Sequence, residues 1–201
     1  MPLQFGGPNL RLLVLADSTA SFYTIQKSAS SVNTLKQNTS NVSEVTPAQY
    51  SLLVDTGLPI YSQARLARFA PLKGHQAAIV TNIGLHFVDV LQKKESILLI
   101  QLDLVALEYS PCDNFVICCE KWNMQKPTEN LFIIDTKKGK IVAKFEWKKS
   151  PKESLKSIRF SSDEKYCMRL VSANTTKEVN SIEVYKDGNF SSPFSVIQSK
   201  F

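Results

Sequence analysis

The sequence predicts an all-β protein built from repeated four-stranded units, and three observations support this prediction. Hydrophobic residues alternate with a period of two along most of the chain, which is typical of strands rather than helices. Clusters of Gly, Pro, Asn, Asp and Ser separate the strand-like runs at short intervals. One pattern of strands and turns then recurs along the chain at offsets of 40 and 51 residues.

The strand-like runs are rich in β-branched and aromatic residues, the types that fit a pleated and half-buried surface. Turn sequences such as SPCDN (110–114) and DTKKG (135–139) separate them. No stretch shows the 3.6-residue period of an amphipathic helix. The clearest runs are LHFVDV (85–90), NLFIIDT (130–136), KIVAKFEW (140–147) and SIEVYKDG (181–188).

Two stretches of the chain carry the repeat most clearly. LEYSPCDNFVICC (107–119) aligns with IRFSSDEKYCMRL (158–170) at an offset of 51 residues. They share an aromatic residue, a serine, an acidic residue in the turn and an apolar strand, whereas Cys118 and Cys119 have no cysteine counterparts. An earlier copy, ARFAPLKGHQAAIV (67–80), matches the first stretch at an offset of 40.

Each repeat reads as four strands, the first ending in an aromatic residue before Ser and Pro, and the third ending in Asp. Four strands per 40 to 50 residues is typical of a β-propeller blade of the WD type. We expect the aromatic residue to pack between blades, and the Ser, Pro and Asp cluster to satisfy local backbone groups. The sequence thus predicts a divergent, partial WD-type β-propeller of about three to four four-stranded blades. Because so few blades cannot close a ring alone, we expect a fragment, a truncated gene product or a piece of a larger assembly.

The N-terminal part of the chain differs from these repeats. Residues 10–26 and 49–63 again read as pairs of strands. Between them, Ser, Thr, Asn and Gln make up 12 of the 19 residues from 28 to 46. Such a segment buries little apolar surface, which predicts a long surface loop or a locally disordered insertion. We therefore expect N-terminal strands with a Ser/Asn-rich insertion over 1–48 and partial propeller blades over 49–201.

The overall charge is compatible with a polyanionic partner such as RNA, since the formal net charge is +6 at pH 7. The longest apolar-rich stretch, residues 97–107, is too short to span a bilayer. The N-terminus lacks the basic leader and the cleavage site of a signal peptide. The four cysteines form no disulfide framework. We therefore expect a reduced, cytoplasmic protein with no membrane partner.

Lysines are concentrated between residues 137 and 156, where eight of them accompany only two glutamates. Ammonium groups beside Phe145 and Trp147 are suited to bind phosphates and to stack on bases. The competing interpretation is a solvated hairpin whose lysines protect an exposed strand. The candidate nucleic-acid-binding residues are Lys137, Lys138, Lys140, Lys144, Lys148, Lys149, Lys152 and Lys156.

The other reactive side chains indicate packing rather than chemistry. His75 and His86 lie 11 residues apart, with no Cys or carboxylate at ligand spacing, which is typical of blade residues. Cys118 and Cys119 are consecutive on a predicted strand, so their side chains point to opposite faces and cannot jointly hold a tetrahedral metal. The sequence holds no phosphate-binding loop, nucleophile elbow or paired catalytic carboxylates. We expect no catalysis, no cofactor and no metal.

Several segments follow one another in an order that resembles a known family. They are residues 107–111, 116–122, 131–140 and 159–169, together with an early strand and turn at 51–62. The series is similar to the N-terminal WD-repeat propeller of the eukaryotic translation initiation factor 2A family. The likeness covers residues 50 to 201, and the first 48 residues have no clear match.

This resemblance implies a non-catalytic role in the early steps of translation initiation. The implied activities are binding to the small ribosomal subunit and promotion of initiator methionyl-tRNA delivery. The implied partners also include mRNA and other initiation factors. The sequence leaves open a second interpretation, a WD-type scaffold for protein–protein interaction, such as a module like the b subunit of initiation factor three. Binding by such a scaffold is expected to be insensitive to salt and to neutralisation of Lys148, Lys149 and Lys152.

Overall fold

The structure is a computed structural model that describes residues 3–6, 11–27, 50–54, 57–98, 103–123, 129–148, 155–171 and 180–199. The segment predicted as an insertion, residues 28–46, lies outside the described residues. Apart from one helical turn at residues 155–157, the regular structure of the described part consists of strands, as predicted. Among the described residues, no helix is long and apolar enough to cross a bilayer.

The strands form four antiparallel sheets in which neighbours in the chain are neighbours in space, and we name them blades 1 to 4 in chain order. Blade 1 contains β1 (Leu3–Gly6), β2 (Arg11–Ala16), β3 (Thr19–Lys27) and β4 (Tyr50–Val54), with β5 (Tyr61–Ser62) also paired to β3. Blade 2 contains β6 (Leu66–Phe69), β7 (Gln76–Val80), β8 (Leu85–Asp89) and β9 (Lys94–Leu98). Blade 3 contains β10 (Leu104–Tyr109), β11 (Phe115–Glu120), β12 (Leu131–Asp135) and β13 (Lys140–Phe145). Blade 4 contains β14 (Ile158–Phe160), β15 (Tyr166–Val171), β16 (Asn180–Lys186) and β17 (Ser195–Ser199).

Blade 1 joins strands from both sides of the boundary predicted at residue 48, because β4 pairs with the second half of β3. It also includes β1, a short strand that lies before the first strand-like run of the sequence and pairs with β2. The predicted division into 1–48 and 49–201 concerns domains rather than sheets, and it stays a prediction.

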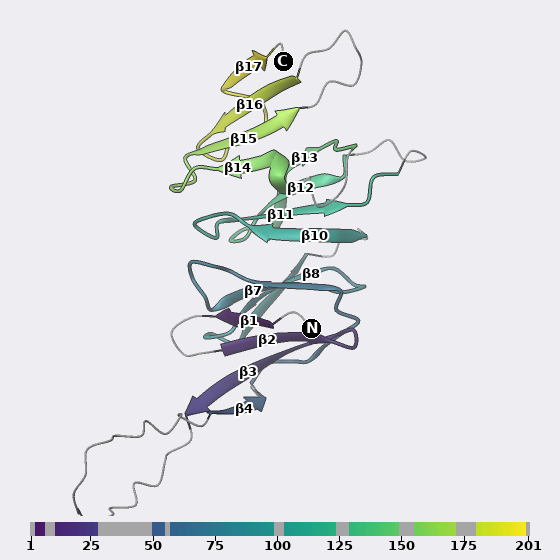
Figure 1. The fold of residues 1–201 in the computed structure, drawn as a ribbon, viewed down its shortest axis with the longest axis vertical. Coiled ribbons are helices and arrows are strands. Elements are labelled where there is room, and N and C mark those ends of the chain that lie inside the picture. Colours follow the sequence, from purple (N-terminus) through teal and green to yellow (C-terminus); the bar gives the residue numbers. More distant parts are fainter. Residues whose placement is uncertain are drawn as a thin grey trace, which may run out of the picture.

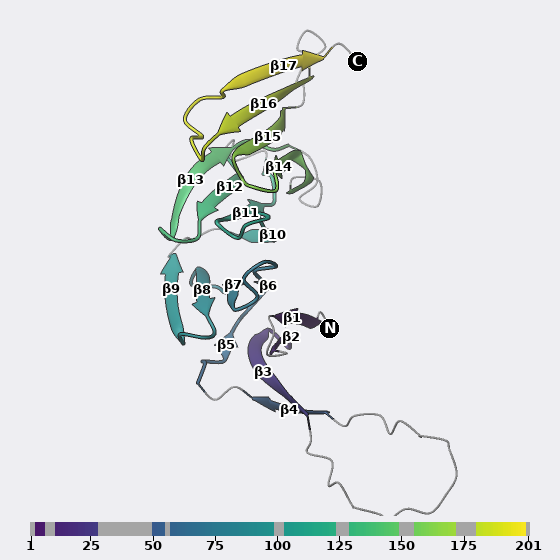
Figure 2. The same cartoon turned by 90° about the vertical axis from the view of Figure 1, so that its left-hand side faces the viewer.

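The four blades are stacked face to face in chain order (Figure 1). Figure 2 shows the fourth strands β9 and β13 along one side of the stack, and the first strands β10 and β14 on the other side. An inner blade is therefore covered on both faces, which explains why β11 and β12 are almost continuously apolar rather than alternating. The architecture is the predicted partial β-propeller, all-β and built from four-stranded blades.

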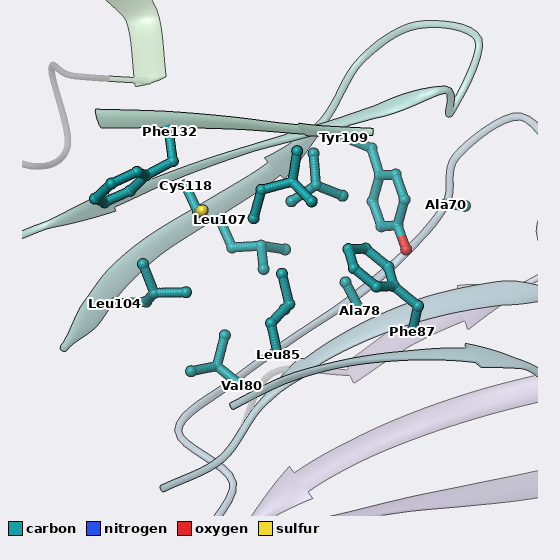
Figure 3. Close-up of a cluster of buried hydrophobic side chains, with 12 residues drawn as sticks. Ala70, Ala78, Val80, Leu85, Phe87, Leu104, Leu107, Tyr109, Cys118 and Phe132 are labelled. Atoms are coloured by element: carbon teal, nitrogen blue, oxygen red, sulfur yellow. The ribbon is translucent and has the colours of Figure 1, made fainter. Parts of the chain in front are cut away.

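Three hydrophobic clusters lie between consecutive blades and hold the stack together. Figure 3 shows the cluster between blades 2 and 3, where Leu85 points toward Leu107 and Phe87 lies beside Tyr109. Leu85 is fully buried, and burial of such a side chain contributes about 1.5–3 kcal/mol to stability. The stack thus has one core per interface rather than a single central core.

The aromatic residue that ends a first strand packs against the preceding blade, as predicted. Phe69 of blade 2 contacts Phe22 of blade 1, with ring centroids 5.8 Å apart. Phe160 of blade 4 stacks on Phe115 of blade 3 at a centroid distance of 5.4 Å. Tyr109 of blade 3 occupies the corresponding place in the cluster between blades 2 and 3. The same position therefore contributes an aromatic side chain to each of the three interfaces between blades.

In blades 3 and 4, the turn after the first strand contains a serine and an acidic residue. The serine makes hydrogen bonds within its own turn, whereas the acidic residue bonds to the neighbouring blade. Ser110 Oγ accepts a hydrogen bond from the backbone N–H of Phe115 at 2.9 Å, and Ser161 makes the equivalent bond at 3.0 Å. Asp113 and Glu164 follow in the left-handed backbone region, with φ of 59° and 56°. The sequence predicts that the whole polar cluster satisfies local backbone groups. The acidic residues instead reach the neighbouring blade.

Asp113 connects blade 3 to blade 2, and we call such a connection a carboxylate clasp. Its Oδ2 accepts hydrogen bonds from the backbone N–H groups of Leu72 at 3.0 Å and Lys73 at 2.6 Å. The side chain is 0% exposed. Burial raises the pKa of this carboxyl above its usual value, and the two N–H donors only partly oppose that effect.

Glu164 forms the second clasp, between blades 4 and 3. Its Oε1 accepts a hydrogen bond from the backbone N–H of Cys112 at 2.5 Å. Its Oε2 accepts one from the side-chain amide of Asn114 at 2.8 Å. Both clasps therefore run from the turn of one blade back to the equivalent turn of the blade before it.

Candidate nucleic-acid interface

The predicted lysines do not form one cluster in the structure. Lys137, Lys138 and Lys140 belong to the turn between β12 and β13, whereas Lys148 follows the far end of β13. A strand of this length spans about 20 Å, so the two groups lie at opposite ends of blade 3. All four side chains belong to exposed residues.

The other predicted lysines are placed as follows. Lys144 is exposed on β13, the fourth strand of blade 3. Lys156 is exposed in the helical turn that precedes β14, at the same end of the stack as Lys148. Lys149 and Lys152 lie outside the described residues. The eight residues are thus close together in the sequence, but the fold separates the six that the structure describes.

The turns that follow first and third strands lie together on one edge of the stack, which we call the turn edge. In blade 2 the N–H of Val90 donates to the carbonyl of His75 at 2.7 Å, and in blade 4 the N–H of Asp187 donates to the carbonyl of Lys165 at 2.8 Å. The clasps continue this edge from one blade to the next. First and third strands of a meander run in the same direction, so the turns after them meet at the same end.

Topology gathers lysines from three blades on the turn edge. Most of them do not stand out in the sequence, because they are dispersed along the chain. The sequence does contain one signal for this edge. A lysine at the turn after the third strand recurs in blades 2, 3 and 4. The turn-edge lysines are Lys73, Lys93, Lys94, Lys137, Lys138, Lys140, Lys165 and Lys186.

Two carboxylates of the turn edge, Asp89 and Asp135, fold back onto the backbone of their own turns. Asp89 Oδ1 accepts hydrogen bonds from the N–H groups of Leu91 and Gln92 at 3.1 and 2.9 Å. Asp135 Oδ1 accepts hydrogen bonds from the N–H groups of Lys137 and Lys138, at 3.0 and 2.9 Å. In blades 2 and 3, the Asp at the end of the third strand therefore builds the following hairpin turn.

Two of these carboxylates are held in their charged form. Burial raises the pKa of Asp135, but hydrogen bonds from Lys138 outweigh burial and hold the pKa below its usual value. The hydrogen bond from the Ser161 hydroxyl, at 2.6 Å, is the main cause of the lowered pKa of Asp163. Lys138 Nζ lies 3.3 Å from Asp135 Oδ2, whereas Lys137 and Lys140 form no ion pair with any described residue.

Both histidines are blade residues, as predicted, and the structure places both in blade 2. His86 is only 4% exposed, and its two ring nitrogens contact Thr81 Oγ1 at 2.8 Å and Glu95 Oε1 at 2.5 Å. The chain Thr–His–Glu has the connectivity of a catalytic triad, but Thr81 is also only 4% exposed. We therefore interpret it as a structural hydrogen-bond network that connects the β7–β8 hairpin to β9. His75 lies in the preceding turn, where its Nδ1 is 2.6 Å from the carbonyl of Lys73.

The adjacent cysteines are divided between two cores. Cys118 packs in the cluster between blades 2 and 3, and Cys119 in the cluster between blades 3 and 4. Burial raises the pKa of the Cys118 thiol, so it stays protonated and unreactive. No group of three or more His, Cys, Asp or Glu side chains within the described ranges is arranged to hold a metal ion.

No family model matches the chain, and no curated protein sequence matches it. Solved structures do share its fold. A crystal structure of a eukaryotic initiation factor superposes with a TM-score of 0.60 at 19% sequence identity, over 76% of this chain and 38% of that chain. A crystal structure of the tricorn protease superposes with a TM-score of 0.57 at 11% identity, over 100% of this chain and 16% of that chain.

These similarities bear on the fold alone, because both identities are far below the level at which function is shared. This chain corresponds to about two fifths of the length of the initiation factor that it matches. The chain is therefore an all-β protein with the fold of a partial β-propeller, similar over three quarters of its length to part of an initiation factor.

Proposed function

We propose that this protein is a non-catalytic translation initiation factor of the cytoplasm. In this proposal it binds the small ribosomal subunit and promotes delivery of initiator methionyl-tRNA, with mRNA and other initiation factors as further partners. The observation that carries the proposal is the row of lysines along the turn edge. The fold shared with an initiation factor and the ordered blade motifs support the same assignment.

The turn edge is suited to the sugar–phosphate backbone of folded RNA. Ammonium groups on successive blades present positive charge in a line, whereas the Asp side chains between them are occupied by backbone N–H groups. Such contacts are independent of base sequence and release condensed counterions, so binding weakens steeply with salt. Lys137, Lys138 and Lys140 are the predicted site residues that belong to this edge.

The proposal is tested with the complete chain, small ribosomal subunits and initiator tRNA, in co-sedimentation and filter-binding titrations at several salt concentrations. The informative variant replaces Lys137, Lys138 and Lys140 with Gln. If all three contact phosphate, the slope of log K against log salt falls by about 2 to 3. The matched control replaces Lys144, Lys148 and Lys156 with Gln, which removes the same charge from residues outside the turn edge.

The two variants separate a specific edge from a general effect of charge. The proposal expects the turn-edge variant to lose most of its affinity and the control to keep it. Equal losses in both would show that net charge alone drives binding, and would contradict the turn edge as the interface. Absence of any association with subunits at low salt would overturn the proposed function itself.

A second function, a scaffold for protein partners, is favoured by one observation. Blade 4 exposes a row of apolar side chains on the face that points away from blade 3. Binding of a protein there is expected to be insensitive to salt and to substitution of the lysines. The salt titration therefore separates the two candidate functions.

A further inference from the structure

A cavity of about 270 Å³ lies between blades 2 and 3, at the turn edge. Blade 2 lines it with a cross-strand row formed by Gln76 on β7, Asp89 on β8 and Lys94 on β9. Blade 3 lines it with Tyr109, at the end of β10, and Thr136, in the turn after β12. The cavity therefore belongs to the same edge of the stack as the proposed RNA contact.

The size and the lining of this cavity suit one planar ring. Pockets for drug-sized ligands have volumes of about 300–1,000 Å³, so the cavity has room for a single ring system and little more. Phe87 and Tyr109 supply aromatic walls from the two blades, and they are 9% and 8% exposed (Figure 3). Ser96, the cross-strand neighbour of Phe87 on β9, is exposed and also lines the cavity. The cavity thus has an aromatic interior and an entrance at β9.

Polar groups around the cavity keep some hydrogen-bonding capacity. Asp89 uses Oδ1 for its own turn, whereas its Oδ2 lies 3.9 Å from His75 Nε2, which is beyond hydrogen-bond distance. Thr136 Oγ1 donates to the carbonyl of Asp113 at 2.8 Å, and its lone pairs can still accept. Burial raises the pKa of Tyr109, so its hydroxyl stays protonated and keeps its donor. An aromatic interior with a polar rim matches a nucleobase, which has a flat face and polar edges.

Positive charge flanks the cavity on both blades. Lys94 lines it on blade 2, and Lys137 follows Thr136 on blade 3, and both lysines are exposed. Glu95 also lines the cavity, but its Oε1 is 2.5 Å from a ring nitrogen of His86. A nucleotide whose base enters the cavity therefore brings its phosphates toward ammonium groups. A neutral aromatic side chain of a peptide gains nothing from this charge.

We propose that this cavity binds one unpaired nucleobase of RNA, which stacks on the aromatic walls while Lys94 and Lys137 contact the phosphates on either side of it. The inference rests on the proposed function and deepens it, because contacts to the sugar–phosphate backbone alone do not require an unpaired base. A base in a single strand or a loop can turn into the cavity, whereas a base in a duplex must first be unpaired and unstacked. The cavity thus makes the turn edge selective for single strands and loops.

The test compares two ligands of equal charge, and both are titrated into the complete chain. One is a short single-stranded RNA backbone without bases, and the other is the same backbone with one central adenine. The affinity for the base-free backbone measures the phosphate contacts of the proposed function. The ratio of the two affinities measures what the base adds. Fluorescence anisotropy at several salt concentrations gives both quantities.

The adenine is expected to strengthen binding by roughly ten- to a hundredfold, as for a base that stacks on an aromatic side chain. Because the two ligands carry the same charge, this ratio should not change with salt. Ser96→Trp places an indole at the entrance of the cavity, so it should abolish the advantage of the adenine and leave the affinity for the base-free backbone unchanged.

Ile97→Trp is the matched control for this variant. Ile97 is the next residue of β9, so its side chain points to the other face of the strand. It is 44% exposed and does not line the cavity. The advantage of the adenine should therefore persist in this variant.

Equal affinities for the two ligands would overturn the inference and leave the proposed backbone contact intact. An advantage of the adenine that persists in Ser96→Trp would place the base elsewhere and would also overturn it. Failure of both ligands to bind at low salt would overturn the proposed function together with this inference.

Two competitors identify other occupants of the cavity. Adenosine monophosphate should bind at least about tenfold more weakly than the adenine-containing backbone, because it makes fewer phosphate contacts. Equal binding would assign the cavity to free nucleotides rather than RNA. Displacement of the adenine-containing backbone by an equal concentration of a short neutral peptide with one tryptophan would assign the cavity to a protein partner. Either result would overturn the inference.

Discussion

Blades 3 and 4 have nearly the same sequence pattern and the same internal geometry, yet they differ in how much of their surface is covered. Both have the serine turn, and the left-handed acidic residues Asp113 and Glu164 have φ values within a few degrees of each other. Both form four-stranded meanders. Blade 3 buries both faces, and blade 4 buries one.

This difference separates two levels of information in the chain. The local pattern determines that a segment becomes a blade, because it specifies the strands, the turn serine and the clasp. The burial of each side chain depends on the neighbouring blades, which the segment itself does not encode. The following changes should therefore have large effects in blade 3 and small ones at the matched positions of blade 4.

The largest difference is expected between Leu131→Ala and Ile182→Ala, which are matched across the repeat. Leu131 is 0% exposed between blades 3 and 4, so truncation leaves a cavity and should cost about 2–5 kcal/mol of unfolding free energy. Ile182 is 37% exposed, so its truncation should cost under about 1 kcal/mol. Urea unfolding of both variants measures the contrast. Similar costs would mean that blade 4 is covered in solution.

The carboxylate clasps are expected to show the next largest effect. Asp113→Ala removes an acceptor from two backbone N–H groups of blade 2, and should cost about 1–3 kcal/mol because hydrogen bonds to charged groups are lost. Glu164→Ala should cost a similar amount at the interface between blades 3 and 4. The exposed neighbour Ser162 provides the control, since Ser162→Ala removes no clasp. A cost for Ser162→Ala equal to that of Glu164→Ala would argue against the clasps.

A smaller effect is expected at the turn after the third strand of blade 3. Gly139 has a φ of +59°, and no atom beyond the glycine and its two chain neighbours lies within 4 Å of the place that a Cβ would occupy. Gly139→Ala should therefore add only the backbone strain of the left-handed region, about 1 kcal/mol. Gly139→Asn should cost less, because Asn tolerates this conformation. Thermal unfolding of the two variants tests the ordering, and equal midpoints would show that the turn relaxes.

The smallest effects concern pH, and they have opposite signs for two carboxylates of blade 3. The pKa of Asp135 is lowered in the folded protein, so its stabilisation is present above the unfolded pKa, about 4, and is lost as pH falls through the folded pKa. The pKa of Asp113 is raised, so its contribution is greatest below about pH 4 and declines as pH rises through the folded pKa.

The measurement is the unfolding free energy of the wild type, Asp135→Asn and Asp113→Asn between about pH 3 and 7, the range that brackets the carboxyl pKa values. The advantage of the wild type over Asp135→Asn should grow with pH. Its advantage over Asp113→Asn should shrink with pH. If both differences in unfolding free energy changed with pH in the same direction, the assigned causes would be contradicted. These causes are hydrogen bonds from Lys138 for Asp135 and burial for Asp113.

The blades themselves could be predicted from the sequence, because their signals are local. The repeat pairs Tyr109 and Ser110 of blade 3 with Phe160 and Ser161 of blade 4. The aromatic residue marks the end of a strand and the serine marks the turn, so each signal needs only one residue type at one position. Opposite faces for Cys118 and Cys119 also followed from strand geometry alone, and the structure confirms it.

The candidate site could be predicted only in part, because proximity in sequence is a poor guide to proximity in a meander. Lys140 and Lys148 are close in the chain, but β13 carries them to opposite ends of the blade. Lys94 and Lys186 are distant in the chain, but the topology places both on the turn edge. The reach of Asp113 and Glu164 across blades was likewise hidden, since it depends on the left-handed backbone of a turn.

The carboxylate clasps also give the stack a direction of assembly. Each one joins a turn to the blade that precedes it in the chain, so a newly made blade needs only residues that have already left the ribosome. The aromatic contacts of Phe69 and Phe160 point the same way. Blades can therefore be added one at a time from the N-terminal end during synthesis, and each addition moves the uncovered apolar face forward by one blade.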